Sequence, residues 1–371
     1  MNILFLTYHG FSDISGISKK MLAQIDGLRQ CEHKVYVCSY SIREDGHRCR
    51  FIDNEVLQDF GCGKLAPIRK RICYNAIYKF CIENNISLVY VRSFHNANPF
   101  TIRLFKKLRK SGISSVMEIP TYPYDQEYIG ANIRTKLGLF IDRIFRKKLS
   151  KQMKGIVTFS DAETIFGQKT IRISNGIDFN SIPLRKPIKH EENELHLLGV
   201  AEVHYWHGFD RVIKGLAKYY NSIQKIKVYF HIVGGIESAT LKEWNNYIYE
   251  HNIQKYVVFH GQEFGDKLTD SFNNADFGIG SLARHRSGID KIKTLKNREY
   301  AARGIPFIYS ETDDDFENMP YILKAPADES EIEIETIINF YSKCNLSPSA
   351  IRDSIGHLSW TYQMAKVIKQ L

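Results

Sequence analysis

The sequence predicts an α/β protein built from two doubly wound, mainly parallel sheets. Short apolar segments alternate with longer amphipathic segments along the whole chain, a pattern typical of βαβ units. A polar stretch without periodicity, residues 181–193, divides the series and reads as a linker. We therefore predict one domain at residues 1–180, joined by a C-terminal helix at 358–371, and a second domain at 181–357. A length of 371 residues suits two domains.

In the first half, strands are expected where β-branched and aromatic residues cluster, and helices where apolar residues recur three or four apart. The strands are expected at residues 2–7, 33–39, 87–91, 114–118, 155–159 and 170–174. The helices are expected at 18–30, 68–84, 99–111 and 132–152.

The second half repeats the alternation. Its strands are expected at residues 195–200, 227–233, 257–260, 276–280 and 306–309, with helices beginning near Asp210, Ser238, Asp266 and Leu295. Gly304 should end the last of these helices in the left-handed conformation. An amphipathic helix at 360–371 closes the chain.

Composition narrows the class of protein. No apolar run approaches the roughly 20 residues of a membrane-spanning helix, and the first residues lack the pattern of a signal peptide. Seven scattered cysteines without a Cys-x-x-Cys pair indicate free thiols in a reducing cytoplasm.

The net charge of +10 is unevenly placed. Residues 1–180 hold 28 Lys and Arg against 16 Asp and Glu, whereas residues 181–371 hold 23 against 25. A basic first half favours an anionic membrane, a phosphorylated lipid or a nucleic acid as partner. Solvated helix faces explain any single basic cluster equally well.

The segment from Lys291 to Ser310 is the leading candidate site, because a loop there enters a short helix. Helix N-termini attract anions, and Lys291, Lys293 and Lys296 crowd this one, with Thr294 and Leu295 between them. Such crowding is unfavourable unless an anion lies among the lysines. Glu299 could accept hydrogen bonds from a ribose. An ordinary helix-to-strand turn is the alternative.

Two further loops of the first half carry candidate residues. Gly16 stands at a helix entrance where backbone N–H groups can meet a phosphate, although the loop lacks a Gly-x-Gly-x-x-Gly fingerprint and a plain capped helix start explains it as well. Glu118 ends a strand and should point into the ligand cleft, where it could bind sugar hydroxyls or stabilise developing positive charge. Tyr122 and Tyr124 follow in a proline-rich loop that suits a sugar face. A solvent-facing loop glutamate is the alternative for Glu118.

In the second half, His207 lies where the first strand of that domain leads into its helix. A metal site at His204 and His207 would lack two further ligands, and the first half has no Asp-x-Asp motif, so neither a metal nor another cofactor is expected. The run Asp313, Asp314 and Asp315 is expected to be a solvated loop.

The order of several motifs resembles the retaining nucleotide-sugar glycosyltransferases of family four. These motifs are Gly16, Asn175–Asp178, His207–Asp210, Val233–Gly235, and Glu299 with Ala302–Pro306. The resemblance runs along nearly the whole chain. It implies the GT-B architecture, in which two Rossmann-like domains face a central cleft, with Glu299 at the donor ribose. It also implies transfer with retention of configuration and without a metal ion.

Four positions depart from the family pattern. Lys291 stands where relatives carry a glutamate, Glu202 where they carry an arginine, His207 where they carry a lysine, and Glu118 where a histidine is frequent. We interpret this as a relocated diphosphate contact, made by Lys291, Lys293 or Lys296. Glu118 and Lys291 are therefore the candidate catalytic residues. The donor-binding candidates are Gly16, His207, Lys293, Thr294, Leu295, Lys296 and Glu299, and Tyr122 and Tyr124 are the acceptor-binding candidates.

The resemblance implies a cytoplasmic hexosyltransferase of capsular, exopolysaccharide or lipopolysaccharide biosynthesis. The basic helix at 133–154 could lie on the inner face of the plasma membrane, which implies a polyprenyl-diphosphate-linked glycan as acceptor. A core helix with a charged outer face is the alternative. A catalytically inactive nucleotide-sugar-binding protein and a nucleotide-sugar epimerase remain open. Nucleic-acid binding is not expected, because no aromatic stacking platform is interleaved with the basic clusters.

Overall fold

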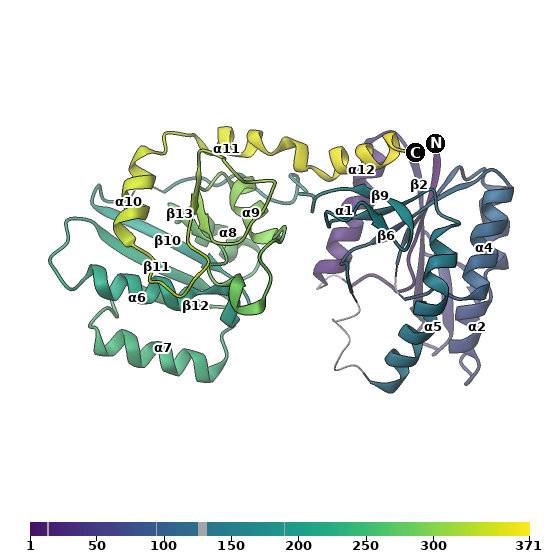
Figure 1. Cartoon of the computed structure of the whole chain (residues 1–371), viewed down its shortest axis with the longest axis horizontal. Helices are drawn as coiled ribbons and strands as arrows, with labels where there is room; N and C mark the ends of the chain where they lie inside the picture. The colour runs from purple at the N-terminus through teal and green to yellow at the C-terminus, as the bar shows by residue number, and fades with distance from the viewer. Residues whose placement is uncertain (13–14, 94, 125–131, 189) are drawn as a thin grey trace. The chain divides into compact units, whose positions relative to one another are not determined.

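The computed structural model describes residues 1–12, 15–93, 95–124, 132–188 and 190–371 (Figure 1). The chain divides into two compact units. Unit 1 comprises Met1–Gly176 and Leu358–Leu371, and unit 2 comprises Ile177–His357. Each unit is an α/β layer structure around a mainly or wholly parallel sheet, so the predicted fold class is confirmed.

Unit 1 contains a nine-stranded sheet in the order β4-β3-β2-β1-β5-β6-β7-β9-β8. Strands β2, β1, β5, β6, β7 and β9 pair in parallel, while β3, β4 and β8 add antiparallel edges. The bounds are β1 Asn2–Leu6, β2 Lys34–Ile42, β3 Arg48–Ile52, β4 Glu55–Asp59, β5 Leu88–Arg92, β6 Ser114–Ile119, β7 Gly155–Thr158, β8 Thr164–Ile165 and β9 Gln168–Arg172.

The hairpin of β3 and β4 was not predicted. Its turn is Asp53-Asn54, where both residues have positive φ, a conformation that suits a tight two-residue hairpin turn. Arg50 interrupts the apolar pattern of β3, although the structure buries it. Its guanidinium donates to the backbone oxygens of Lys70 and Cys73, which hides the charge inside the unit.

The helices of unit 1 cover both faces of this sheet, as expected for a doubly wound fold. They are α1 Gly16–Gln30, α2 Ala66–Ile72, α3 Asn75–Glu83, α4 Pro99–Lys110, α5 Ile133–Ser150 and α12 Trp360–Lys369. The single helix predicted at 68–84 is in fact α2 and α3. Cys73 between them has an extended backbone, which breaks the helix.

Unit 2 has a six-stranded, fully parallel sheet in the order β12-β11-β10-β13-β14-β15. Its strands are β10 Glu194–Val200, β11 Lys227–Val233, β12 Val257–Gly261, β13 Phe277–Ile279, β14 Phe307–Tyr309 and β15 Ile322–Lys324. Its helices are α6 Phe209–Tyr219, α7 Ser238–Glu250, α8 Gly265–Asn273, α9 Leu295–Arg303, α10 Ile334–Lys343 and α11 Pro348–Ser354, with short 3-10 helices η2 Tyr205–His207, η3 Arg284–Ser287 and η4 Gly356–Leu358. Strand β15 and helices α10 and α11 were not predicted.

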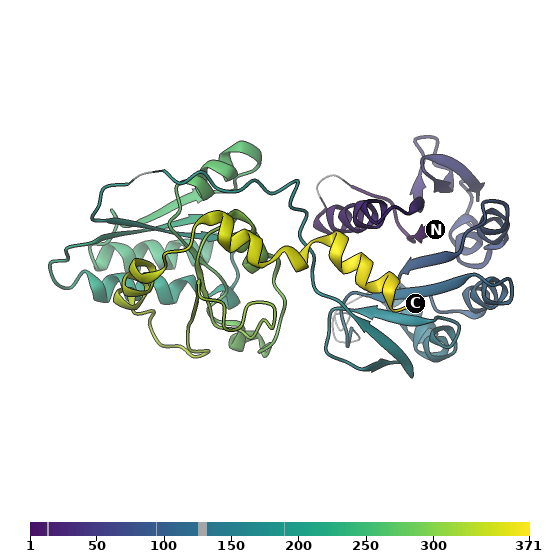
Figure 2. The same cartoon turned by 90° about the horizontal axis from the view of Figure 1, so that it is seen from above.

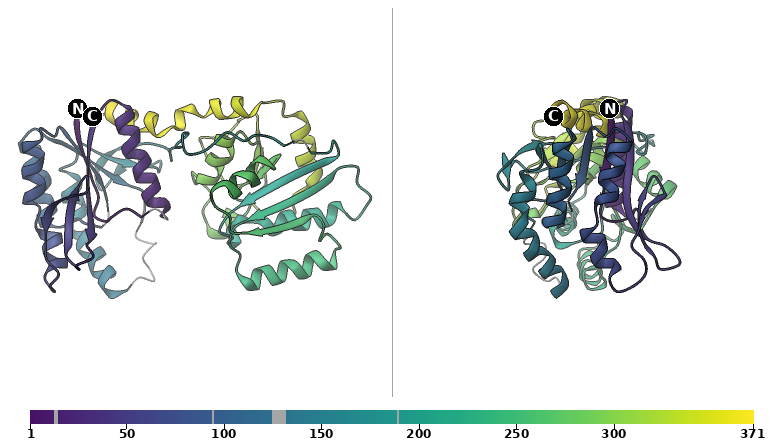
Figure 3. Two further views of the ribbon diagram at one scale, coloured as in Figure 1. Left: turned by 180° about the vertical axis from the view of Figure 1, so that it is seen from behind. Right: turned by 90° about the vertical axis from the view of Figure 1, so that its right-hand side faces the viewer.

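Helix α12 packs on α1, so the C-terminal segment belongs to unit 1, as Figure 2 shows in yellow. Figure 3 shows both chain ends in this unit. Trp360, Met364 and Val367 enter the core beside α1. Close approach depends on two glycines. A Cβ at Gly27 would lie 2.8 Å from the Trp360 backbone, and one at Gly176 would overlap the Trp360 indole.

Gly176→Ala is expected to destabilise unit 1 by about 1–3 kcal/mol, because overpacking forces Trp360 out of its place. Gly63→Ala is the matched control, since a Cβ there meets nothing within 4 Å. Thermal unfolding followed by the fluorescence of Trp360, in a background where Trp206 and Trp244 are replaced by Phe, measures the effect. Equal melting temperatures for the two variants would contradict this packing.

Among the described residues, no helix is both long enough and apolar enough to cross a membrane.

Candidate functional site

The strand order of unit 2 marks one place for a ligand. From β10 the sheet extends to β11 and β12 on one side and to β13, β14 and β15 on the other. The sheet thus changes its direction of growth between β10 and β13, which makes the carboxyl ends of these two strands its switch point. Open parallel sheets bind their ligands at such a point. The residues of these two loops, together with the loop after β14, form the candidate site.

Two backbone hydrogen bonds join the loop after β10 to the loop after β13. The N–H of Leu282 donates to the carbonyl oxygen of His207 at 2.9 Å, and the N–H of Ala283 donates to that of Trp206 at 3.3 Å. Gly208 makes this possible, because its φ is 65° and a Cβ would lie 2.9 Å from the Ala283 Cβ. The two loops thus form one fixed wall of the site.

His207 is buried in this wall as a neutral imidazole. Its pKa falls to about 2, first because it is buried and then because Lys296 and Arg284 lie near it. The backbone N–H of His204 donates to Nδ1 of His207 at 3.0 Å, so the ring proton of His207 is on Nε2. His207 can therefore donate one hydrogen bond to a ligand but supplies no charge, unlike the lysine of the family pattern.

Three ionisable side chains lie near one another at this switch point: Arg284, Lys296 and Glu311. The Lys296 ammonium is buried 5.4 Å from the Phe209 ring centroid, and the Arg284 guanidinium lies 5.5 Å from the Trp206 ring. Glu311 is only 2% exposed. Within the part of the chain that the structure describes, Lys296 Nζ, Arg284 Nε and both carboxylate oxygens of Glu311 make no hydrogen bond.

Burial sets the protonation of this cluster. It lowers the pKa of Lys296 to about 7 and raises that of Glu311 to about 7. Arg284 has a lowered pKa for the same reason, and it opposes protonation of Lys296. Buried polar groups without hydrogen-bond partners lower the stability of the folded protein. Several such groups in one place therefore indicate a ligand-binding site. Because Lys296 and Glu311 titrate in the same range and Arg284 stays charged, the cluster carries a net positive charge, which favours an anion.

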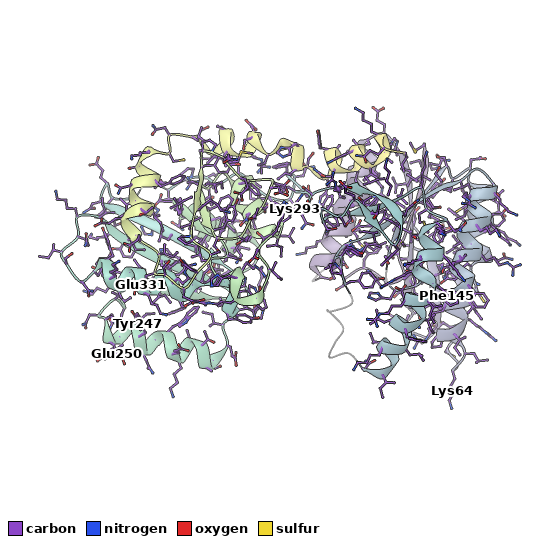
Figure 4. The ribbon with its side chains drawn as sticks, in the orientation of Figure 1. Lys64, Phe145, Tyr247, Glu250, Lys293 and Glu331 are labelled. Atoms are coloured by element: carbon purple, nitrogen blue, oxygen red, sulfur yellow. The ribbon has the colours of Figure 1, made fainter. Side chains whose placement is uncertain are left out.

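Lys291 and Lys293 each form an ion pair with an aspartate of this protein. Lys291 is half exposed and lies 2.7 Å from Asp314, and Lys293 lies 3.8 Å from Asp315, on the segment that Figure 4 labels at Lys293. The expectation of a solvated loop is wrong for Asp313, which is 0% exposed and pairs with Arg298 at 2.8 Å. Of the three predicted lysines, Lys296 is the one in the buried cluster.

Helix α9, which carries Lys296, begins at Leu295, as predicted. Thr294 caps it by accepting a hydrogen bond from Asn297 N–H at 3.4 Å, and Leu295 is exposed. Gly304 ends the helix with φ of 77°, which confirms the predicted left-handed cap. Glu299 lies in the middle of the helix, where Arg303 donates to its Oε1 at 3.0 and 3.1 Å. Glu299 would have to share this oxygen to bind a ribose.

The expectation that Glu118 points into a cleft is wrong. Its side chain is 0% exposed inside β6. Arg92 pairs with Oε1, while Tyr90 and Gln24 donate to Oε2. Burial alone would raise its pKa, but Arg92 and the other donors bring the pKa below its usual value. Glu118 is therefore an ionised carboxylate saturated by neighbours in the core of unit 1.

Gly16, Tyr122 and Tyr124 belong to unit 1, whereas the cluster belongs to unit 2. Gly16 is the first residue of α1, and a Cβ there would meet nothing within 4 Å. Tyr122 is half-buried, 5.8 Å from the Phe166 ring. Tyr124 is buried, and its hydroxyl donates to Asp142 at 2.7 Å, so this hydroxyl already has a partner within unit 1.

Arg284 and Glu311 were missed from the sequence. Arg284 stands in a basic stretch that reads as a surface loop, and Glu311 precedes an acidic run that reads the same way. The available signal was their position just after two predicted strands, β13 and β14, at the carboxyl edge of the sheet. No group of three or more His, Cys, Asp or Glu in the described ranges could hold a metal ion.

Comparisons with known proteins identify the architecture. No family model matches the sequence, and no curated protein matches it. Solved structures do match over the full length. A sucrose-phosphate synthase from Thermosynechococcus elongatus has a TM-score of 0.58 at 15% identity, covering 100% of this chain and 98% of that one. HepE from Anabaena in complex with UDP has a TM-score of 0.57 at 14% identity, with 100% of both chains covered.

The catalytic domain of starch synthase IV from Arabidopsis thaliana, bound to ADP and acarbose, has a TM-score of 0.60 at 12% identity, covering 100% of this chain and 98% of that domain. The chain thus has the fold of GT-B glycosyltransferases, with two parallel-sheet α/β domains. At these identities the likeness establishes the fold and leaves the chemistry to the residues of the site.

Proposed function

We propose that this protein is a glycosyltransferase that takes a sugar from a nucleoside diphosphate and transfers it to an acceptor hydroxyl. The observation that carries the proposal is the buried cluster of Arg284, Lys296 and Glu311 at the switch point of unit 2. A diphosphate supplies the negative charge that the two cations lack. Structures of the same fold that contain UDP or ADP support the choice of a nucleotide.

The chemistry follows from where the cations lie. Arg284 and Lys296 would bind the diphosphate oxygens, and His207 would donate one hydrogen bond from Nε2. These groups stabilise the charge that grows on the phosphate as its bond to the sugar carbon breaks. The acceptor oxygen forms the new bond to that carbon, and its proton goes to the departing phosphate. Lys291, Lys293, Thr294, Leu295 and Glu299 remain donor-site candidates around this centre, and Gly16 remains one in unit 1.

The finer assignments rest on the family resemblance of the sequence. They are transfer of a hexose with retention and without a metal ion, and a role in capsular, exopolysaccharide or lipopolysaccharide biosynthesis in the cytoplasm. The acceptor would be a glycan on a polyprenyl diphosphate, presented at an anionic membrane surface. The exposed basic residues of α5, among them Lys136, Arg143, Lys147 and Lys148, support this membrane association.

A screen of nucleotide-sugars by thermal shift, followed by mass spectrometry of the products, tests the function. A ligand at a hundred times its Kd should stabilise the protein by about 2.7 kcal/mol. Turnover of the bound donor only with an acceptor glycan supports a transferase. Binding without turnover would make the chain an inactive binding protein, and turnover without an acceptor would make it an epimerase. If no nucleotide-sugar stabilised the protein, the proposal would be overturned.

Nucleoside diphosphate affinity is expected to fall as the pH rises through 7. Lys296, with a pKa of about 7, loses its charge over this range, while Glu311 gains a competing one. A bound anion favours the protonated form of both groups, so binding takes up protons and is tighter at pH 6 than at pH 8. Titration calorimetry across this range measures the trend, and Glu311→Gln should flatten it. An affinity that rises with pH would contradict the cluster as the binding site.

A further inference from the structure

Helices α2, α4 and α5 of unit 1, which Figure 1 shows close together, present a surface of exposed apolar and basic residues. We call it the amphipathic face. Its apolar residues are large and between 36% and 85% exposed. They are Leu65, Ile68 and Ile72 at α2, Phe100 at α4, and Ile133, Leu137, Phe140, Ile141 and Ile144 on α5. Exposed apolar patches of this kind mark binding surfaces rather than ordinary solvated helices.

Cations are interleaved with these apolar residues. The segment 64–72 contributes Lys64, Arg69, Lys70 and Arg71 and contains no acid, and Figure 4 labels Lys64 there and Phe145 on α5. The one acid of α5, Asp142, is buried and accepts hydrogen bonds from Tyr124 and the Ala97 N–H. The exposed charge of the amphipathic face is therefore wholly positive in these two segments.

A groove of about 460 Å³ opens within this face. Ile68, Ile72, Phe100, Leu137 and Ile141 form its apolar walls. Gly138 of α5 leaves the space open opposite α2, because a Cβ there would come no nearer than 4.0 Å, to Arg71 Nη1. The volume is in the range of small-molecule sites, and the walls are rigid helices.

The inner end of the groove reaches the strand edge of unit 1. Tyr8 follows β1, and His95, Asn96 and Ala97 follow β5. These strands are neighbours, with β2 on the far side of β1 and β6 on the far side of β5. The groove therefore leads from the amphipathic face to the switch point of this sheet, where a ligand is expected.

Lys70 and Arg71 line the groove without a compensating carboxylate among the described residues. Burial, and after it the positive charges of Arg71, Arg50 and Arg48, lower the pKa of Lys70 to about 8. Its ammonium instead lies 3.2 Å from the Tyr40 ring centroid. An anion between these cations would relieve their repulsion.

We propose that this groove binds an anionic lipid, with an apolar chain along Ile68, Ile72, Leu137 and Ile141 and a phosphate at Lys70 and Arg71. Under the proposed function, on which this role rests, the lipid is the carrier of the acceptor and its polar end reaches the switch point. The surrounding amphipathic face lies on the membrane that supplies the lipid. A protein partner fits less well, since a groove of this size with two cations in its lining matches a single apolar chain with a charged head.

Titration calorimetry tests the proposal by measuring how tightly monomeric dihexanoyl phosphatidylglycerol binds to the full-length protein. Glycerol 3-phosphate offers the phosphate without chains, and dihexanoyl phosphatidylcholine offers the chains without net charge. We expect the anionic lipid to bind at least tenfold more tightly than either. Equal binding of glycerol 3-phosphate would make this a plain phosphate site and overturn the proposal.

Two variants separate the groove from general charge. Gly138→Phe should fill the groove and abolish lipid binding, and Lys70→Gln with Arg71→Gln should weaken it at least tenfold. Ile223→Ser, at a fully exposed position of unit 2, is the control. If Gly138→Phe bound the lipid as tightly as the wild type, the proposal that the groove binds the lipid would be overturned. It would also be overturned if phosphatidylglycerol vesicles captured the protein while the monomeric lipid did not bind. Nucleoside diphosphate binding should be unchanged in every variant, so failure of the lipid site and of the donor site can be told apart.

Discussion

Lys296→Met is expected to weaken nucleoside diphosphate binding by about tenfold to a hundredfold. Hydrogen bonds to charged groups are worth about 1.5–3 kcal/mol, and the buried ammonium of Lys296 makes no hydrogen bond among the described residues. The same change removes a buried charge that lacks hydrogen bonds, so the ligand-free protein should melt at the same temperature or higher. A gain in stability with a loss of affinity is typical of a residue kept for binding.

Titration calorimetry and thermal unfolding of the same samples measure both effects. Lys255→Met is the control, because Lys255 is an exposed lysine of unit 2. If Lys296→Met destabilised the ligand-free protein and left the affinity unchanged, Lys296 would be a structural residue, and the donor site would have to lie elsewhere.

Glu118→Ala is expected to destabilise unit 1 by about 3–5 kcal/mol. The change leaves Arg92 buried without its carboxylate, and an unpaired buried charge is costly. A double variant, Glu118→Met with Arg92→Met, should recover most of the loss, because apolar side chains of similar volume can replace a buried ion pair.

Urea unfolding followed by Trp360 fluorescence reports on unit 1 alone in a Trp206→Phe, Trp244→Phe background, since these are the three tryptophans. This measurement also decides between the two roles of Glu118. Normal stability with lost transfer activity would restore the catalytic role that its position at a strand end predicted. Lost stability, recovered by the double variant, identifies a structural ion pair.

The fold could be predicted because strand and helix periods are local properties of the chain. The segment 88–91 has no charged residue and is buried throughout, since both faces of a doubly wound sheet are covered. The hairpin at residues 48–59 was missed because buried Arg50 breaks the apolar pattern, and its charge is satisfied by distant backbone oxygens. Contacts across the fold of this kind leave no periodic trace in the sequence.

The candidate site was predicted in part for the same reason. The helix entrance at Thr294 and the glycine cap at Gly304 are local, and both were found. Which lysine is buried depends on Asp314 and Asp315, which approach Lys291 and Lys293 from another loop. The burial of Glu118 likewise depends on Arg92, Tyr90 and Gln24 from other elements. Spatial pairing, rather than residue type, separates the ligand-facing charges from the structural ones.

The central claim is that Arg284 and Lys296 hold the diphosphate of a nucleotide donor. Titration of UDP, ADP and GDP into the wild type and into the double variant Arg284→Ala, Lys296→Met tests it most directly. The account predicts that at least one of these nucleotides binds the wild type and that the double variant loses this binding by a hundredfold or more. Binding of equal strength to both proteins, or no binding of any of the three to the wild type, would contradict it.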